Sequence, residues 1–190
     1  MMEVIAPPQT RRGMPQPINR AAIAADLERA RIDFQHLTEM ADDDDWIKPT
    51  KGTRWNNEEL LFHMVFGYMV VQRLLLLVRL FDRLPDSVSR RYARVLNAVT
   101  PAFDVINYYG SRFAARIYNR NRMAAKLDRV INSLQRALSR APEHDFRRGM
   151  HYPDDWDPYF RDYMTLEDVY RYPGQHYDHH RRQLTLNGLA

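Results

Sequence analysis

Apolar residues recur at helical spacing along most of the chain. Over residues 20–40 they fall three or four positions apart and make one apolar stripe, as the buried face of a helix requires. The stripe consists of Ile23, Leu27, Ala30, Phe34 and Leu37. A second segment, about residues 56–83, is apolar on nearly every side, which predicts a buried core helix. Gln72, Arg73 and Arg79 interrupt it, whereas a membrane span needs roughly 20 mostly apolar residues with few charges.

Two of the predicted helices begin at a capping box with a hydrophobic staple. In a capping box, the cap side chain and the third helical residue each bond the other's backbone N–H group. Asn56 with Glu59 has this pattern at the start of the second helix, and Thr165 with Asp168 has it at the start of the last. The two helix starts are therefore determined locally.

The middle of the chain predicts additional helix. Residues 86–108 predict an extra helix that breaks near its Thr-Pro step, and residues 111–140 predict one long helix. Residues 147–164 form a loop rich in aromatic side chains. The pattern indicates a single all-α domain over residues 19–190, preceded by a mobile, proline-rich arm over residues 1–18.

Composition narrows the classes of function. The chain has 190 residues, of which 45% are hydrophobic, and this fits one globular domain. Cys 0 excludes disulfides and thiolate metal sites and is consistent with a cytoplasmic protein. The net charge is +4, but arginines alternate with acidic and apolar residues, so we expect a solvated basic surface and no nucleic-acid partner. Arginine far outnumbers lysine, which favours a bacterial source.

Histidines cluster near the C-terminus. The stretch YPGQHYDHHRRQL (172–184) holds three of the chain's 7 histidines. His176 and His180 are four residues apart, so on a helix their rings point the same way. A third nitrogen ligand can come from His63 in the apolar second helix. By itself, a histidine in that helix would be a core residue whose ring is hydrogen-bonded inside the protein. By itself, the C-terminal cluster would be the polar end of a helix. Together, the two features favour a divalent metal site.

These segments resemble the DinB-like (YfiT-like) superfamily of metal-binding four-helix bundles. The resemblance rests on WIKPTKGTRWNNEELLFHMVFGYM (46–69) and MTLEDVYRYPGQHYDHHRRQL (164–184). It implies an up-and-down four-helix bundle with an extra helical insertion between the second and third core helices. It also implies that His63, His176 and His180 bind the metal ion.

Two features depart from the family pattern. Pro173 lies just before the ligand pair, and proline removes an N–H group and clashes with the preceding turn. We expect a kink or a fresh helix start there, with residues 176–186 helical in either case. Residues 84–110 have the character of an insertion. The first departure concerns the continuity of the helix and leaves the ligand set unchanged.

Three protein ligands leave a coordination position open, as in catalytic zinc sites. Neutral nitrogen ligands suit zinc first, with nickel or iron as alternatives. The resemblance implies a thiol-dependent transferase or isomerase that joins a low-molecular-weight thiol to an electrophilic substrate. The alternative is a non-catalytic, metal-stabilised bundle that binds a partner or serves in a stress response. The oligomeric state is open, with a homodimer as one candidate.

Four further residues could contribute to the site. His151 and Tyr152 lie in the aromatic loop, which could roof the metal pocket and select the substrate, or else pack the loop onto the bundle. Gln183 could hydrogen-bond a ligand histidine or make an ordinary polar contact within the bundle. His179 lies off the face shared by the ligand pair, so we expect an outer contact or an exposed ring.

Overall fold

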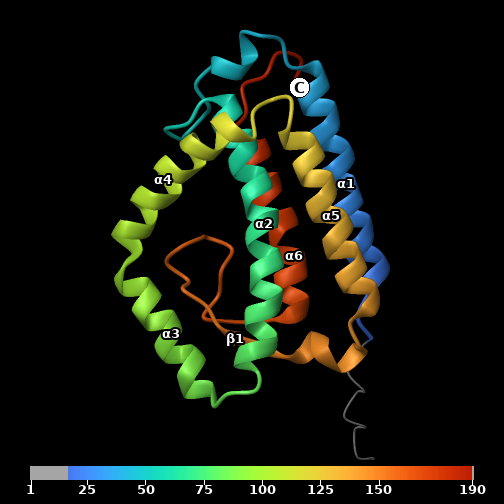
Figure 1. Ribbon diagram of the computed structural model, residues 1–190, viewed down its shortest axis with the longest axis vertical. Helices are drawn as coiled ribbons and strands as arrows, with labels where there is room; N and C mark the ends of the chain where they lie inside the picture. Colours follow the sequence, from blue (N-terminus) through green and yellow to red (C-terminus); the bar gives the residue numbers. More distant parts are fainter. Residues whose placement is uncertain (1–16, 190) are drawn as a thin grey trace, which may run out of the picture.

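The computed structural model describes residues 17–189 and is mainly helical (Figure 1). The helices are α1 (Arg20–Met40), α2 (Asn57–Phe81), α3 (Asp86–Ala98), α4 (Thr100–Ile117), α5 (Met123–Arg140) and α6 (Leu166–Arg181). Strands β1 (Gly149–His151) and β2 (Tyr163–Thr165) pair antiparallel, and two short 3-10 turns, η1 (Asp45–Ile47) and η2 (Glu143–Arg147), complete the elements. The predicted N-terminal arm lies outside the described residues, apart from its last two.

Four of the helices form the predicted four-helix bundle. Both α1 and α2 pack against α5 and α6, so α1 and α2 occupy diagonal positions. The colours of Figure 1 show that α1 and α6 run upward while α2 and α5 run downward. The directions therefore do not alternate strictly along the chain, because α3 and α4 carry it from the lower end of α2 back to the upper end. The predicted insertion is thus the return path that makes α2 and α5 parallel.

The core explains the hydrophobic pattern. All five residues of the predicted stripe on α1 are buried. Helix α2 lies between α4, α5 and α6, so its apolar residues are buried on several sides. It is long and apolar enough to cross a membrane, but 56% of its most apolar window is buried inside the protein. Its apolarity therefore suits a central core helix, where each fully buried aliphatic or aromatic side chain contributes roughly 1.5–3 kcal/mol.

The prediction of one helix over residues 111–140 is wrong. Helix α4 continues through Ile117, the chain turns, and α5 begins at Met123. A tertiary contact accompanies the turn, since the backbone N–H of Arg120 donates to Glu58 at the start of α2 (3.2 Å). The predicted break at the Thr-Pro step is confirmed, since α3 ends at Ala98 and proline occupies the first turn of α4. The insertion therefore extends to the end of α4.

Helix α6 begins at the predicted capping box and continues unbroken through Pro173. The fresh start is therefore not observed, and the spacing of the two histidines is kept. The predicted helical end at Leu186 is wrong, because α6 stops at Arg181. A Cβ atom on Gly174 would overlap the carboxylate of Asp26 on α1, so any larger residue here would displace that side chain.

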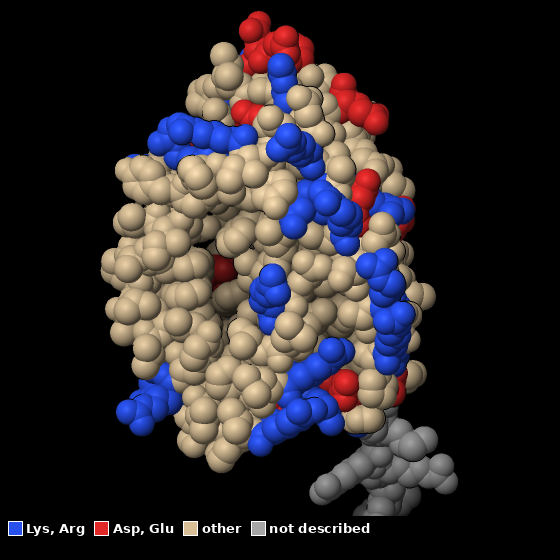
Figure 2. Space-filling model, viewed as in Figure 1, with Lys and Arg blue, Asp and Glu red and all other residues tan. Residues whose placement is uncertain are grey.

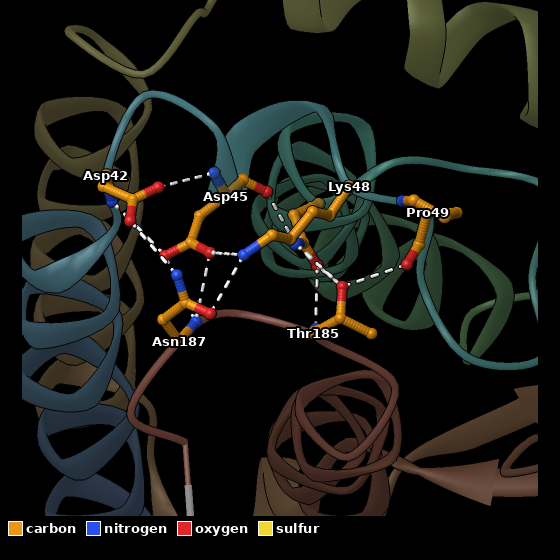
Figure 3. Close-up of polar contacts among 7 residues, drawn as sticks. Asp42, Asp45, Lys48, Pro49, Thr185 and Asn187 are labelled. Carbon is orange, nitrogen blue, oxygen red and sulfur yellow. Dashed lines mark hydrogen bonds and ion pairs between the residues drawn. The ribbon is translucent and has the colours of Figure 1, made fainter.

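The chain after α6 packs back onto the loop between α1 and α2 (Figure 3). Buried Asp45 accepts hydrogen bonds from Lys48 Nζ (2.6 Å) and from the backbone N–H of Asn187 (3.1 Å). The backbone N–H of Thr185 donates to Asn57 Oδ1 (3.0 Å). Burial acts to raise the pKa of Asp45, but these hydrogen bonds outweigh it and lower the pKa. The contacts hold the C-terminal segment beside the upper end of α2.

Candidate metal centre

The three predicted histidines meet between α2 and α6. The ring centroids of His63 and His176 are 5.1 Å apart, those of His63 and His180 are 4.8 Å apart, and those of the α6 pair are 4.5 Å apart. One ligand nitrogen from each ring lies within 4.8 Å of the other two. His63 and His176 are buried, while His180 is partly exposed. The arrangement follows from the i, i+4 spacing on α6 and the direct packing of α6 on α2.

Outer hydrogen bonds orient two of the rings. His63 Nδ1 lies 3.2 Å from Ser111 Oγ on α4, and His180 Nδ1 lies 2.7 Å from Gln183 Oε1. Each contact leaves the Nε2 atom of its ring free, in the way that partners of metal-binding histidines usually do. The contact of Gln183 with a ligand histidine was one of two alternatives from the sequence. Ser111 was not predicted, because only the packing of α4 on α2 brings it to the site.

A glycine makes room for the third ring. A Cβ atom on Gly67 would lie 2.7 Å from His176 Nδ1 and 3.0 Å from its Cε1 atom. The His176 ring therefore rests directly on the backbone of α2, one turn after His63. Its Nδ1 atom is buried without a hydrogen-bond partner among the described residues. The Nε2 atom points away from this contact, toward Asp157.

The electrostatics of the site favour neutral rings. Burial, followed by the neighbouring imidazoles, lowers the pKa of His63 well below its usual value. The same causes lower the pKa of His176 and of His180 to about 3. Metal ions bind the neutral form of imidazole, so at neutral pH no proton needs to be displaced.

This donor set fits one divalent ion. Three nitrogen atoms bound tetrahedrally at ~2.0–2.1 Å would lie about 3.3 Å from one another. The observed limit of 4.8 Å exceeds this spacing by an amount that small side-chain rotations can close. Three neutral nitrogens are suited to zinc, nickel or iron.

A carboxylate that the sequence did not single out lies beside the histidines. Asp157 belongs to the loop between β1 and β2, and its Oδ2 atom is 3.7 Å from His176 Nε2. The hydroxyl of Tyr172 donates to Oδ2 (2.9 Å), and the backbone N–H of Tyr159 donates to Oδ1 (2.8 Å). Burial raises the pKa of Asp157 despite these hydrogen bonds. Three aspartates lie close together in the sequence PDDWDPY, and no periodicity in it indicates which one faces the site.

The histidines and Asp157 are among the residues that line a cavity of about 390 Å³. Its walls come from α2, α4, α6, the loop before α2 and the loop between β1 and β2. Six aromatic side chains line it: Trp55, Phe66, Phe103, Trp156, Phe160 and Tyr172. Figure 2 shows a hollow on the face between α4 and α2, with an acidic group at its floor. The sequence left two roles open for the aromatic loop, and its place in the lining fits the one in which it covers the metal pocket.

The other candidates lie outside this cavity lining. His151 is buried between two aspartates, with its Nδ1 atom 2.7 Å from Asp162 and its Nε2 atom 3.2 Å from Asp86. Tyr152 is buried and packs on Phe160. His179 Nδ1 lies 3.3 Å from the hydroxyl of Tyr159, which makes it an outer contact of the loop. His151 and Tyr152 therefore contact other residues of the β1–β2 segment and do not line the cavity.

Comparison with known proteins agrees with this geometry. Residues 26–184 match the sequence model of the DinB superfamily. A search of curated proteins found no match. Among solved structures, the chain is similar to YfiT from Bacillus subtilis, described as "a probable metal-dependent hydrolase with an unusual four-helix bundle topology". The TM-score is 0.59 at 14% identity, over 95% of this chain and 91% of that chain, so this likeness shows the fold. Because the family match spans most of the chain, including all three histidines, the protein belongs to the DinB superfamily.

Proposed function

We propose that the protein is a metal-dependent enzyme in which His63, His176 and His180 hold a divalent ion. The observation that carries this proposal is the position of the three nitrogens at the wall of a cavity. Structural zinc sites are closed by four protein ligands, whereas catalytic sites keep a position open to substrate. A bundle that used the ion only for stability would have no need of a cavity beside it. The geometry therefore favours the enzyme over the non-catalytic scaffold.

A divalent ion at this position supplies a Lewis acid that lowers the pKa of a bound nucleophile. The side chains supply the remaining functions. Ser111 and Gln183 hold two of the imidazole rings in orientation. The carboxylate of Asp157, fixed by Tyr172, is placed to accept the proton that the nucleophile loses. The aromatic walls limit the access of bulk water, which strengthens electrostatic interactions inside the cavity.

Two nucleophiles are consistent with this arrangement. We favour water, and hence hydrolysis, although the carboxylate that lies 3.7 Å from His176 Nε2 can accept a proton from either nucleophile. The description of YfiT as a probable metal-dependent hydrolase supports this choice. Transfer of a low-molecular-weight thiol to an electrophile, as the sequence resemblance implies, uses the same ion and the same proton acceptor. The cytoplasmic location, a homodimer, and the absence of nucleic-acid and membrane partners stay predictions.

The decisive experiment compares two variants of the metal-loaded protein. His180→Ala should lose both the metal and turnover, measured by elemental analysis and by hydrolysis of a panel of activated esters and amides. Asp157→Asn should keep the metal but lose turnover by roughly 100-fold or more, as is typical when a proton acceptor is removed. Asp155→Asn is the matched control, because Asp155 lies in the same loop and is exposed.

Cobalt separates the two nucleophiles and the scaffold alternative. In the cobalt-substituted protein, a thiol that binds the ion adds a charge-transfer band, whereas hydrolysis alone requires none. A band together with thiol-dependent turnover would replace hydrolysis by thiol transfer. Stoichiometric metal with no turnover of either kind, and only a loss of thermal stability on chelation, would overturn the enzyme proposal.

A further inference from the structure

We infer that the cavity beside the histidines binds an uncharged small molecule with a flat apolar group and one hydrogen-bonding group that meets Asn107 on α4. This inference rests on the proposed function and specifies the class of substrate. The insertion and the loop between β1 and β2 build the wall that selects it.

The part of the cavity wall formed by α4 and the loop is aromatic and already assembled. Phe103 of α4 and Trp156 of the loop stack with their ring centroids 3.8 Å apart and their planes 9° apart. Trp156 Nε1 donates to the carbonyl of Leu96 (3.0 Å), and Asn97 Nδ2 donates to Asp154 (2.8 Å). These contacts tie the loop to the junction of α3 and α4. Because the wall needs no ordering on binding, an apolar planar ligand can use most of its contact energy for affinity.

The charge of the lining selects against anions. Among residues 17–189, no lysine or arginine lines the cavity, and Asp157 is the one carboxylate that does. An anionic group placed among the aromatic side chains would lose its hydration without gaining a counter-ion. A metal ion at the histidines attracts the reacting end of the substrate, but the remainder of the ligand meets only apolar surface and an amide. The cavity therefore favours a neutral molecule for two reasons. Its apolar side chains contact an apolar ligand, and its lining offers no cationic side chain to an anionic one.

Asn107 supplies a specific polar contact. It lies on the part of α4 that forms the cavity wall, one turn after Phe103. Its Oδ1 atom is buried and has no hydrogen-bond partner among the described residues. A buried carbonyl oxygen without a partner is costly, so such atoms in native proteins call for an explanation. The oxygen has almost no accessible surface in the structure, so the Asn107 side chain would turn toward the cavity, where an N–H or O–H group on a bound ligand would satisfy it.

Hydroxamates test the inference on the full-length, zinc-loaded protein. Acetohydroxamate and benzohydroxamate share the zinc-binding group, so the difference between their affinities reports the cavity. By calorimetry, benzohydroxamate should bind at least ~10-fold more tightly, because burying a phenyl ring contributes more than a factor of ten. 4-Carboxybenzohydroxamate should lose this gain, whereas 4-carbamoylbenzohydroxamate, which is neutral and carries N–H donors, should keep it.

Variants on α4 locate the effect. Phe103→Ala should reduce the preference for benzohydroxamate while acetohydroxamate still binds, which shows that the metal site is intact. Asn107→Leu should remove any advantage of the carbamoyl compound over benzohydroxamate. Val105→Ala is the matched control, because Val105 is 56% exposed on the same helix and does not line the cavity.

The outcomes distinguish this inference from the proposed function. If the protein binds no zinc and neither simple hydroxamate, the proposed function and this inference both fail. If acetohydroxamate binds but benzohydroxamate binds no more tightly, the apolar cavity is not a substrate site and this inference alone fails. Tighter binding of the 4-carboxy compound than of benzohydroxamate would overturn the selection for neutral molecules.

Discussion

Replacing Gly67 with alanine should separate helix stability from metal binding. A Cβ atom at this position would lie 2.7 Å from His176 Nδ1, whereas ordinary contacts begin near 3.4 Å, so the ring must retreat by about 0.7 Å. Metal–ligand distances lie within about 0.2 Å of their standard values, and the alanine methyl would hold the ring away from the position in which a small rotation brings its Nε2 atom to the ion. We expect the affinity for zinc to fall by at least ~10–100-fold, similar to the loss of an outer support of a ligand histidine. A competition titration against a chelating dye measures this change.

The stability of the metal-free protein should respond differently. Alanine is favoured over glycine inside a helix by roughly 0.5–1 kcal/mol, so the contact with His176 acts against a gain in helix stability. Gly110 on α4 is the matched control, because a Cβ atom there meets nothing within 4 Å. Gly110→Ala should raise the Tm by about 2–4 °C per kcal/mol gained, with zinc affinity unchanged. Wild-type zinc affinity in Gly67→Ala would refute the argument that this glycine makes room for the ligand ring.

Three further predictions concern acid stability, an outer hydrogen bond and the C-terminal contacts. The pKa of His180 is about 3 in the folded protein, whereas a histidine in the unfolded chain has a pKa of ~6.5. Between these two values the unfolded chain binds a proton that the folded chain does not. The stability of the metal-free protein should therefore decrease as the pH is lowered through this window. Urea unfolding at pH 7 and pH 5 should show a smaller fall in His180→Gln, and equal falls would contradict this cause. Gln183→Ala should weaken zinc binding by about 10–100-fold in a calorimetric titration, whereas Gln175→Ala, at an exposed position on α6, should not. Asp45→Asn should lower the free energy of unfolding by about 1–3 kcal/mol. The same change at exposed Asp44 is the control and should have little effect. Similar values for the two variants would show that the buried carboxylate does not hold the C-terminal segment.

Local sequence determined several features of this protein. The stripe on α1 and the capping boxes of α2 and α6 involve residues no more than four positions apart, so a short window contains the whole interaction. The pairing of His176 with His180 is local in the same sense. The assignment of His63 as their partner needed one further observation, namely a polar ring in an apolar helix, together with the family resemblance.

Tertiary structure decided the features that depend on contacts between distant segments. The turn that separates α4 from α5 coincides with a contact to Glu58, more than sixty residues earlier in the chain than Arg120. The end of α6 at Arg181 similarly coincides with a contact to the loop before α2, where the backbone N–H of Lys51 donates to the carbonyl of Gln183 (2.8 Å). In both places the residues themselves are compatible with helix, so propensity alone predicts continuation.

The candidate metal centre likewise combines features that the local sequence predicts with features that depend on tertiary contacts. The three histidines carry a local signal, but Ser111 and Asp157 reach them only because α4 packs on α2 and the β1–β2 loop folds over α6. The cavity is likewise lined by residues from α2, α4, α6, the loop before α2 and the β1–β2 loop, none of which encloses a space alone. Helical periodicity and capping act over a few residues and can therefore be predicted from the sequence. The shape, charge and outer hydrogen bonds of a site depend instead on which distant surfaces pack together.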